Sequence, residues 1–594
     1  MYMFSVSREE LISVPQADTL RSFCRKNKNR CLLVAGIAGL ILLLFIITIN
    51  ISCSKNTAQH CPENRTHHTL ADCFFNAVVA SDSSTCSEIG RDILHQGGSA
   101  VDAAIATMLC VGLYNIHSMG IGGGGVFTIY NKTTGNVEII NARETAPSKA
   151  TRTMLMCDIK TKPGLLIGVP GELRGYEMAH QRHGRLPWKK LFEPSIKLAR
   201  EGITVSRALA NAIKEEKDSI LYYDTLRKMF LDSYNNTLEE KATVKFPVLA
   251  DTYARIAEEG VDVFYNGDLS GKIVADIQAA GGIITAEDLK NYKAEWMAYA
   301  TNFTIGDYIF LAPNAPFGGP VLTRIFKILQ DYSFSSESVS TPAKRTLTVH
   351  RMIEAFRFAD LEKLNLGDPL KKNKYYEIVK KITSDSVAKE FKINDTHTQY
   401  EYGSLPPKDD HGTSHLSIID VDGNAVAVTS SINDYFGSKV ASPSTGILFN
   451  NQMEDFSDCN DPVVNQNNWI EPGKRPLSSM CPTIILNKNT KKVKMVVGAE
   501  GGTNITTTVA QVILNSLFFC RSPKDAVKEP RVQVPMNQTN VEEGFDEEVF
   551  KGLEEKGHIM GKKTEPTVAQ LIVRHADKLC AVSDERKGGS PAGY

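Results

Sequence analysis

Thr413, which follows a glycine at the start of a predicted strand, has the clearest chemical potential of any residue in this sequence. The run 409–420 reads DDHGTSHLSIID, and from Thr413 onward its side chains alternate as those of a strand do. A hydroxyl at this point can attack the carbonyl carbon of Gly412 and form an ester, which water cleaves to leave threonine as a new N-terminus. The freed α-amino group has an ordinary pKa of about 8 and can act as general base for the threonine's own hydroxyl. The alternative is an ordinary strand start, because glycine–threonine pairs are common there.

A predicted hairpin decides which residue lies opposite Thr413. Strands are expected over 413–420 and 424–429, joined by a Val-Asp-Gly turn at 421–423. A three-residue loop with Gly423 in the left-handed conformation pairs position 413 with position 431 and places Ser431 across from Thr413. A two-residue turn would instead place Ile432 there and turn Ser431 to the other face of the sheet.

The glycine-rich run 120–125 (GIGGGG) satisfies the G-x-G-x-x-G pattern but not the structural context of that pattern. A dinucleotide site needs a strand before the glycines and a helix after them. Here a helix is predicted to begin at Ser99, with Asp102 as its capping-box partner, and strands are predicted over 126–130 and 137–140. The run is therefore interpreted as a tight helix-to-strand turn with close backbone packing.

Composition and charge indicate a large folded protein and argue against a nucleic-acid partner. The 594 residues include 67 Lys+Arg and 68 Asp+Glu, a net charge of −1 without the basic excess of a nucleic-acid-binding protein. Hydrophobic residues make up 42% and charged residues 23%, which is typical of globular chains. Helical and strand patterns alternate from residue 71 onward, with a mostly helical stretch over 185–300 and a strand over 493–497. The alternation predicts a layered α/β fold.

One apolar segment predicts where in the cell this protein is located. Residues 31–49 carry no charge and no proline and are long enough to cross a bilayer as a helix. Basic residues precede this segment: Arg25, Lys26, Lys28 and Arg30. The positive-inside rule therefore predicts a single-pass type II protein of the cell membrane, with a cytoplasmic tail at 1–30, a transmembrane helix at 31–51, a stalk at 52–70 and the remaining chain outside. A cleaved signal peptide and a buried core helix are the alternatives, but the run is longer than a signal-peptide core and apolar on every face.

An extracellular location makes the sequons and the cysteines interpretable. The Asn-x-Ser/Thr sequons at which glycosylation is expected are Asn64, Asn131, Asn235, Asn302, Asn394 and Asn537. Cys86 and Cys110 flank an apolar helical stretch and could pair as a disulfide in an oxidising compartment.

Several long motifs together resemble the γ-glutamyltransferase (glutathione hydrolase) family, in particular its membrane-bound vertebrate members. The motifs are GSAVDAAIA (98–106), SMGIGGGG (118–125), NARETAP (141–147), TSSINDYFGSKV (429–440), GILFNNQMEDF (446–456), PLSSMCPTI (476–484), GAEGGTNITT (498–507) and SDERKGGSPAGY (583–594). They are distributed over nearly the whole predicted extracellular part of the chain, which makes the resemblance specific.

The resemblance implies a fold of the N-terminal-nucleophile class, a four-layer αββα sandwich made as one precursor. By analogy, cleavage between Gly412 and Thr413 separates a large-subunit part (71–412) from a small-subunit part (413–594), and the two stay together noncovalently as a heterodimer. Thr413 corresponds to the nucleophile, which forms a γ-glutamyl ester with glutathione or glutathione S-conjugates and passes the glutamyl group to water or to acceptor amino acids and dipeptides. Neither a metal nor an organic cofactor is implied.

The resemblance also implies substrate-binding roles for the residues of this sequence that stand at matching positions of these motifs. Arg143 corresponds to the residue that binds the substrate α-carboxylate, for which a planar guanidinium is well shaped. Without the resemblance, Arg143 would be interpreted as half of a surface ion pair with Glu144. Ser478 and Ser479 correspond to the pair that hydrogen-bonds the same carboxylate, and an ordinary turn after a proline is the alternative.

The resemblance implies the residues of the α-ammonium site and of the oxyanion hole in the same way. Asp455 corresponds to the residue that receives the substrate α-ammonium, with help from Asn433 and Gln452. Gly501 and Gly502 correspond to the oxyanion hole, because backbone N–H groups at the start of a helix expected from Thr503 can bind an anion. An ordinary strand-to-helix turn is the alternative. The sequon at Asn504 lies inside this motif and is expected to carry no glycan, and the pair Cys86–Cys110 matches a family disulfide.

Two positions depart from the family pattern. Ser431 stands where a second threonine usually orients the nucleophile, so a modest change in processing or rate is expected. Gln452 stands where some members have glutamate, which removes one charge from the ammonium site. An N-terminal-nucleophile amidase with another acyl preference and a catalytically silent interaction protein remain as alternative functions.

Overall fold

The computed structural model describes residues 73–154, 162–297, 300–369, 372–386, 391–399, 412–457, 465–535, 538–561 and 566–594. These residues belong to one compact unit of the chain, residues 61–594. The predicted tail, transmembrane segment and stalk, together with Asn64, Asn537 and the polar stretch 400–410, lie outside the described residues. Within the described part of the chain, no helix is both long and apolar enough to cross a membrane.

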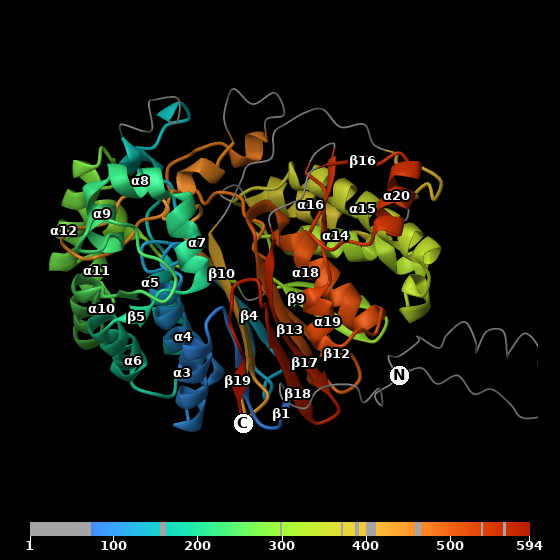
Figure 1. Ribbon diagram of the computed structural model, residues 1–594, viewed down its shortest axis with the longest axis horizontal. Helices are drawn as coiled ribbons and strands as arrows, with labels where there is room; N and C mark the ends of the chain where they lie inside the picture. The colour runs from blue at the N-terminus through green and yellow to red at the C-terminus, as the bar shows by residue number, and fades with distance from the viewer. Residues whose placement is uncertain are drawn as a thin grey trace, which may run out of the picture. The chain divides into compact units, whose positions relative to one another are not determined.

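Two seven-stranded antiparallel sheets occupy the centre of the fold (Figure 1). The first sheet has the strand order β19 (Ala592–Gly593), β2 (Val78–Ala80), β10 (Thr413–Ile419), β11 (Ala425–Ser431), β3 (Gly124–Tyr130), β4 (Val137–Ala142) and β7 (Glu295–Met297). The second has the order β1 (Cys73–Phe74), β18 (Lys578–Ser583), β17 (Val568–His575), β13 (Val493–Glu500), β12 (Thr483–Asn487), β9 (Tyr308–Ala312) and β8 (Thr301–Ile305). The central strands β10 and β13 contact each other across the two sheets.

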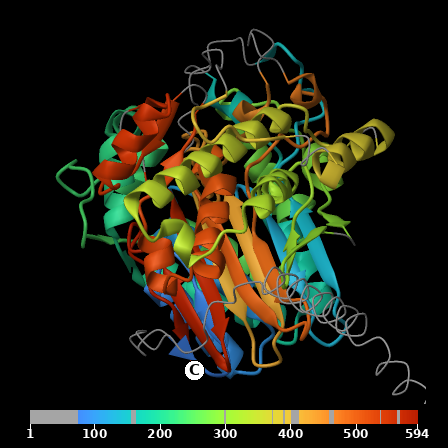
Figure 2. The same ribbon diagram turned by 90° about the vertical axis from the view of Figure 1, so that its right-hand side faces the viewer.

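Helices cover the outer face of each sheet, so that the layers follow the order helices, sheet, sheet, helices. The first sheet contacts α3 (Ser84–His95), α4 (Ala100–Tyr114) and α5 (Glu172–His183). This layer continues with α6 (Trp188–Glu201), α7 (Arg207–Glu215), α8 (Lys217–Tyr222), α9 (Asp224–Phe230), α10 (Pro247–Glu259), α11 (Asp262–Tyr265), α12 (Asp268–Ala279) and α13 (Ala286–Asn291). The second sheet is covered by α14 (Gly319–Leu329), α15 (Pro342–Lys363), α16 (Lys372–Ile382), α18 (Ile505–Ile513), α19 (Pro523–Lys528) and α20 (Glu547–Glu555), several of which lie in front of it in Figure 2. The predicted layered α/β fold is confirmed.

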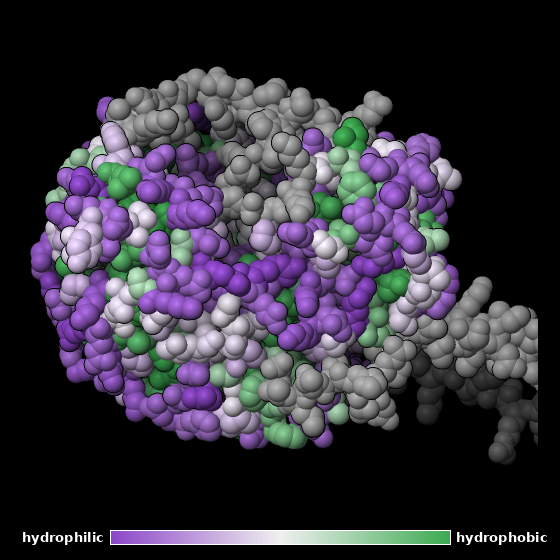
Figure 3. All heavy atoms as spheres, in the orientation of Figure 1, coloured by the Kyte–Doolittle hydropathy of each residue, from purple (hydrophilic) through white to green (hydrophobic). Residues whose placement is uncertain are grey.

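Short strands complete the fold. A two-stranded sheet pairs β5 (Ile203–Thr204) with β6 (Thr243–Val244), and a three-stranded sheet joins β14 (Val532–Gln533), β15 (Gln538–Val541) and β16 (Ile559–Met560). On the face that Figure 3 shows, hydrophilic residues predominate and apolar residues are scattered.

Three apolar cores separate the layers, and β10 contributes to two of them. Leu416 and Ile418 face α4 and its neighbouring helices. Ile419 points the other way and packs between the two sheets, against residues of β12 and β13. Because side chains alternate along a strand, Thr413 and His415 share the face of Ile419, and the nucleophile candidate points into the space between the sheets.

The hairpin has the register that a three-residue loop predicts. Thr413 pairs with Ser431 and Ile419 pairs with Ala425. The loop closes through hydrogen bonds from Gly423 N to Asp420 O (3.0 Å) and from Asp420 N to Asn424 O (3.0 Å), with Gly423 at φ = 82°. The two-residue alternative, which would place Ile432 opposite Thr413, is therefore excluded.

The glycine run 120–125 is a turn between a helix and a strand, as predicted. Helix α4 starts after Ser99 with the expected capping box to Asp102, and β3 begins at Gly124. A Cβ on Gly123 would lie 2.2 Å from the carbonyl oxygen of Ser431, which no side chain can tolerate. The glycines therefore let the turn pack directly on the end of β11, beside the nucleophile candidate.

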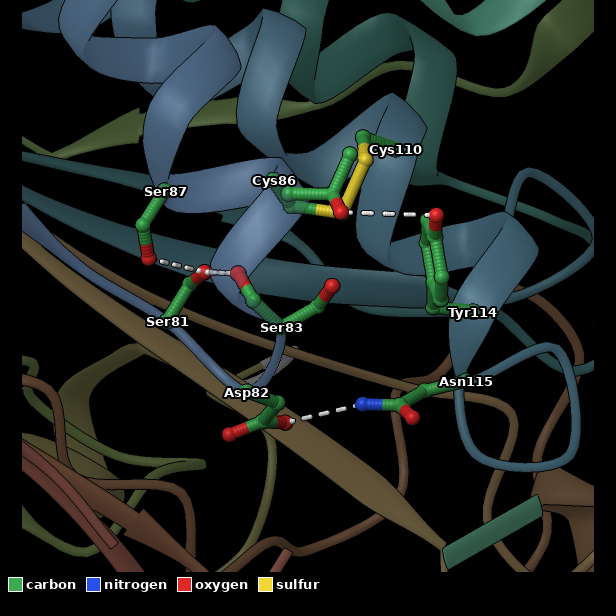
Figure 4. The surroundings of a disulfide bond; sticks show 9 residues. Ser81, Asp82, Ser83, Cys86, Ser87, Cys110, Tyr114 and Asn115 are labelled. Carbon is green, nitrogen blue, oxygen red and sulfur yellow. Dashed lines mark hydrogen bonds between the residues drawn. A yellow bond between two sulfur atoms is a disulfide. The ribbon is translucent and has the colours of Figure 1, made fainter. Parts of the chain in front are cut away.

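Two disulfides have both of their cysteines among the described residues, and Cys520 is also disulfide-bonded. Cys86 pairs with Cys110 as predicted and joins α3 to α4 (Figure 4). Cys73 pairs with Cys580, a link that the sequence reasoning did not foresee. Among the described sequons, Asn235 and Asn302 are exposed, and Asn131, Asn394 and Asn504 are half-buried.

We predict that Gly123→Ala pushes the end of β11 away from the glycine turn. Overpacking of this kind lowers the free energy of unfolding by about 2 kcal/mol or more, so the melting temperature should fall by several degrees. Thermal unfolding of the purified protein measures this. The matched control is Gly271→Ala in α12, where a Cβ has open space and alanine is the better helix former. Equal melting temperatures for the two variants would show that the close approach to Ser431 is unimportant.

Candidate active site

Thr413, Ser431 and Gly412 form a continuous hydrogen-bonded group. Thr413 is 5% exposed, and its Oγ1 donates to Ser431 Oγ at 3.1 Å. Ser431 Oγ donates in turn to the carbonyl oxygen of Gly412 at 2.5 Å and accepts a bond from the backbone N–H of Asn433 at 2.8 Å. Ser431 can therefore take the proton of the attacking hydroxyl while it polarises the carbonyl that is attacked.

Gly412 adopts a backbone conformation that only glycine takes easily. Its φ is 126°, and a Cβ there would lie 2.4 Å from the carbonyl oxygen of Asn433. Any other residue at this position would be strained and would push the attacked carbonyl away from Ser431.

Arg143 lies buried at the end of β4 and pairs with Asp455. The guanidinium Nη2 donates to Asp455 Oδ2 at 2.5 Å, and the side chain also donates to the carbonyl oxygens of Pro476 (3.4 Å) and Leu477 (3.3 Å). Arg143 is 1% exposed. The surface ion pair with Glu144 that the sequence alone would favour is therefore wrong, because the cation is inside the protein and its partner is far away in the chain.

The residues predicted around the α-ammonium site lie together. Asp455 ends the short 3₁₀ helix η7 (Gln452–Asp455) and accepts a hydrogen bond from Gln452 Nε2 at 2.6 Å. Asn433, at φ = 77°, joins this group to the nucleophile: its Nδ2 donates to Asn451 O at 3.4 Å, while its N–H reaches Ser431.

Ser478 and Ser479 follow the carbonyl groups that Arg143 contacts. Ser478 N donates to Pro316 O at 2.8 Å, and Ser479 Oγ accepts from Lys363 Nζ at 2.5 Å. Both serines are almost buried, at 8% and 6% exposure. Lys363, which the sequence reasoning did not single out, therefore brings a positive charge next to Ser479.

The two glycines of the predicted oxyanion hole lie where β13 ends, in the sheet that packs on β10. Gly501 has φ = 122° and Gly502 has φ = 53°, and a 3₁₀ turn η9 (Gly502–Asn504) separates them from α18. The helix expected from Thr503 therefore begins later, at Ile505, because the chain must reverse through two left-handed residues before helical geometry can start.

Two buried carboxyl groups lie beside the site, and both have raised pKa values. Burial raises the pKa of Glu144 to about 8, although Arg143 opposes the shift. Burial also raises the pKa of Glu172 to about 7, against the effect of hydrogen bonds from Tyr176 (2.5 Å) and from Ser430 (2.7 Å), the neighbour of Ser431. Glu144 is therefore mostly protonated near pH 7, and the carboxyl group that contacts Arg143 is that of Asp455.

A buried lysine reaches the nucleophile from the C-terminal tail. Lys587 Nζ donates to the carbonyl oxygen of Thr413 at 2.8 Å and to Ser414 Oγ at 3.2 Å, and it pairs with Asp82 at 3.0 Å and with Glu500. Sequence reasoning assigned no role to these three charged residues. The only available signal was that Lys587 lies in the C-terminal motif and that Glu500 precedes the two glycines.

Another cluster of side chains contains the residue types that bind metals, but its polar atoms are already hydrogen-bonded to one another and to neighbouring residues. His350, Glu354 and His558 have ligand atoms within 4.8 Å of one another. Their atoms are already engaged: His350 Nε2 bonds to Asn394 O (2.8 Å), His350 Nδ1 to His558 Nε2 (2.7 Å), and the Glu354 carboxylate accepts from Thr398 and Gln399. Burial lowers the pKa of both histidines, which keeps them neutral and mutually satisfied.

A polar pocket of about 450 Å³ is lined in part by the segment that follows Asn433, including Asp434 and Tyr435. Its lining is strongly acidic, with one lysine. The charged residues are Glu215, Glu216, Asp434, Glu454 and Lys439. A pocket of this charge favours ligands that carry an ammonium group.

Two packed antiparallel sheets between helical layers, with a hydroxyl residue at the start of a central strand, define an N-terminal-nucleophile type of hydrolase. A cephalosporin acylase from Bacillus halodurans has this fold: it superposes with a TM-score of 0.77 at 25% identity, over 88% of this chain and 96% of that one. The sequence model of gamma-glutamyltranspeptidase matches residues 86–594.

Curated relatives agree with that match. Glutathione hydrolase 2 of Arabidopsis thaliana is 41% identical over 553 residues, covering 88% of this chain and 94% of the relative. Scoloptoxin SSD14 of Scolopendra dehaani is 39% identical over 551 residues (89% and 94%), and the human glutathione hydrolase 5 proenzyme is 38% identical over 563 residues (88% and 93%). The chain belongs to the gamma-glutamyltranspeptidase family and is an enzyme, a hydrolase and acyltransferase.

We predict that Glu144 makes the protein less stable as the pH rises. Its pKa is raised in the folded state, so the folded protein retains a proton that the unfolded chain releases, and stability declines from the ordinary pKa of 4.5 up to about 8. Chemical denaturation across this range should show a smaller decline for Glu144→Gln than for the native protein. Glu240→Gln, at an exposed position, is the control and should leave the pH dependence unchanged. Parallel curves for native protein and Glu144→Gln would contradict a protonated Glu144.

Proposed function

We propose that this protein is made as a precursor, cleaves itself between Gly412 and Thr413, and then uses Thr413 to cleave γ-glutamyl amides. The substrates are glutathione and glutathione S-conjugates, and the acceptors are water, amino acids and dipeptides. The observation that carries the proposal is the contact chain from Thr413 Oγ1 through Ser431 Oγ to the Gly412 carbonyl. The names of the curated relatives, which include glutathione hydrolases and proenzymes, support it.

Self-cleavage follows from these contacts. Thr413 Oγ1 attacks the carbonyl carbon of Gly412, and its proton passes to Ser431 Oγ as the Ser431 hydroxyl proton moves to the developing oxyanion. The proton on that oxygen then passes to the nitrogen of Thr413, the carbon–nitrogen bond breaks, and the nitrogen leaves as an amine, which gives an ester. Water hydrolyses this ester to a Gly412 carboxylate and a free Thr413 hydroxyl.

The mature enzyme repeats the same attack on substrate. The neutral α-amino group of Thr413 accepts the hydroxyl proton, and Oγ1 attacks the γ-glutamyl carbonyl carbon. Backbone N–H groups of Gly501 and Gly502 stabilise the oxyanion, and the leaving amine takes the proton. Water or the amino group of an acceptor then attacks the Thr413 ester, which releases the glutamyl group and restores the hydroxyl.

The Arg143–Asp455 pair explains selectivity for the glutamyl group. The α-carbon of a γ-glutamyl substrate carries a carboxylate and an ammonium, and this pair offers a complement to each. The substrate carboxylate binds Arg143 with the hydroxyls of Ser478 and Ser479, and the ammonium binds Asp455 with Asn433 and Gln452. An amidase for apolar acyl groups has no use for a buried ion pair at this place, which argues against the alternative acyl preference.

The proposed location is the outer face of the cell membrane, with residues 31–51 as a type II anchor. It is supported by the apolar segment with its preceding basic residues and by the disulfides Cys86–Cys110 and Cys73–Cys580, which persist in oxidising compartments. The six sequons at Asn64, Asn131, Asn235, Asn302, Asn394 and Asn537 would then be available for glycosylation.

We predict that Thr413→Ala leaves a folded, uncleaved chain without activity, because alanine has no attacking oxygen. A denaturing gel after reduction and deglycosylation, with N-terminal sequencing of the smaller band, should show a fragment that begins Thr-Ser-His-Leu-Ser only in the native protein. Ser431→Ala should slow cleavage by about 10²-fold or more, as loss of an oxyanion donor does, whereas Ser431→Thr should cleave at least as fast as native. A native protein that stays uncleaved would contradict the proposal.

We predict that Asp455→Asn raises KM for a γ-glutamyl anilide by about 10²-fold, since it removes a buried partner of the substrate ammonium worth about 3 kcal/mol. Initial rates of anilide release at varied substrate concentration measure this. Asp268→Asn at the surface is the control and should leave KM unchanged. An unchanged KM for Asp455→Asn would show that the zwitterion binds elsewhere.

A further inference from the structure

Lys587 is a fully charged side chain placed in the interior beside the nucleophile. It is 7% exposed, and it lies between the carboxylates of Asp82 and Glu500 and the carbonyl oxygen of Thr413. A buried ammonium is strongly unfavourable unless it is paired and hydrogen-bonded. Burial lowers the pKa of Lys587, but the two carboxylates outweigh burial, so the pKa is raised and the side chain stays charged.

The partners of Lys587 come from three separate segments that must meet at the active site. Glu500 ends β13 and directly precedes Gly501, and Thr413 opens β10. Asp82 follows β2 and is held by Gln570 Nε2 (2.5 Å) and Asn115 Nδ2 (3.4 Å), the second of which is drawn in Figure 4. One ammonium group therefore ties the nucleophile strand to the oxyanion loop and to the large-subunit part.

We propose that Lys587 is a positioning residue of the γ-glutamyl transfer reaction, which fixes Thr413 against the oxyanion loop and holds a positive charge beside the α-amino group of Thr413. The inference rests on the proposed function. Because Nζ is 2.8 Å from Thr413 O, bond geometry places it within about 6.5 Å of the Thr413 nitrogen. A positive charge at this distance disfavours the ammonium form of the amino group, which leaves it free to accept the hydroxyl proton.

The other titratable groups around Thr413 do not replace this charge. His117 and His415 are buried and neutral, because burial lowers the pKa of each, and Lys587 adds to the shift at His117. The titratable and charged groups on the packed elements are Asp82, His117, His415, Asp434, Glu500 and Lys587.

The test is the pH profile of kcat/KM for a γ-glutamyl anilide in Lys587→Met. We expect its acidic limb to move up by about one pH unit and kcat near neutrality to fall about 10-fold, because the amino group is then protonated more readily. KM should change little, since Arg143 and Asp455 are untouched. Lys494→Met is the matched control: Lys494 also donates to a backbone carbonyl, Arg574 O at 2.7 Å, and its loss should leave the profile native.

A second variant distinguishes loss of the positive charge from failure of the protein to fold. Lys587→Met leaves Asp82 buried without its cation, so the double variant Asp82→Asn/Lys587→Met removes both charges and should fold and cleave while it keeps the shifted profile. A folded, cleaved variant with native kcat and native pH limbs would overturn the role of Lys587. A native enzyme that turns over no γ-glutamyl amide would instead contradict the proposed function itself.

An independent observation concerns how the two subunits stay together. Cys73 in β1 faces Cys580 in β18 across an antiparallel pair, and the two form a disulfide. Cys73 lies before the proposed cleavage site and Cys580 lies after it, 507 residues apart in the chain. Sheet pairing between β1 and β18 involves only two residue pairs, so the covalent bond is the main link at this edge.

We infer that the two subunits remain covalently joined after cleavage, which corrects the expectation of a purely noncovalent heterodimer. The inference also rests on the proposed self-cleavage. Since residue 73 directly follows the predicted stalk, the bond also connects the catalytic small subunit to the chain that carries the predicted anchor.

Denaturing gels with and without reductant test this link. The native protein should run as one band without reductant and as two bands with it, and Cys580→Ser should give two bands in both lanes. Cys86→Ser is the matched control, because Cys86 and Cys110 both lie before the cleavage site and its loss should not release the small subunit. Two native bands without reductant would overturn the inference, and a Cys580→Ser protein that stays joined would overturn the assignment of the link to Cys73–Cys580. One native band even after reduction would instead contradict self-cleavage.

Discussion

The backbone register between β10 and β11 is the constraint on which the chemistry of this protein depends. A shift by one residue would turn Ser431 to the opposite face and leave Thr413 without its hydrogen-bond partner. Two glycines secure the register from outside the strands. Gly423 closes the three-residue loop, and Gly123 lets the preceding turn press on the carbonyl of Ser431. The geometry around Thr413 is thus a consequence of sheet pairing.

Around this hairpin, the buried cationic side chains each pair with a carboxyl group. Arg143 pairs with Asp455 and Lys587 pairs with Asp82, while burial raises the pKa of Glu144 and of Glu172 and so favours their neutral forms. In the absence of substrate, the Arg143–Asp455 pair satisfies two charges whose desolvation would otherwise be very unfavourable. In the proposed function, a γ-glutamyl substrate exchanges partners with this pair and leaves no charge unpaired, which would favour zwitterionic ligands over simple anions or cations.

Local patterns made the hairpin, the Ser99 cap and the glycine turn predictable, because each depends on residues a few positions apart. The assignments of Arg143, Asp455 and the serines came from motif resemblance, since their meaning depends on contacts between distant segments. Arg143 and Asp455 are 312 residues apart, so composition and periodicity could only suggest the neighbouring Glu144 as a partner. For the same reason, Lys587 with Asp82 and Cys73 with Cys580 could not be predicted: nothing in either sequence neighbourhood indicates the other.

The serine at position 431 shows how the fold can replace a side-chain constraint with a backbone one. A threonine hydroxyl is oriented by its methyl group, because β-branching restricts rotation about χ1. Ser431 lacks that restriction, but its oxygen is held by three contacts: to Gly412 O, Thr413 Oγ1 and Asn433 N. Two of these contacts are to backbone atoms whose positions are set by residues with positive φ, Gly412 and Asn433. The orientation of the hydroxyl therefore depends on that turn, and changes in Gly412 or Asn433 should affect a serine-containing enzyme more than one in which the methyl group of threonine provides independent support.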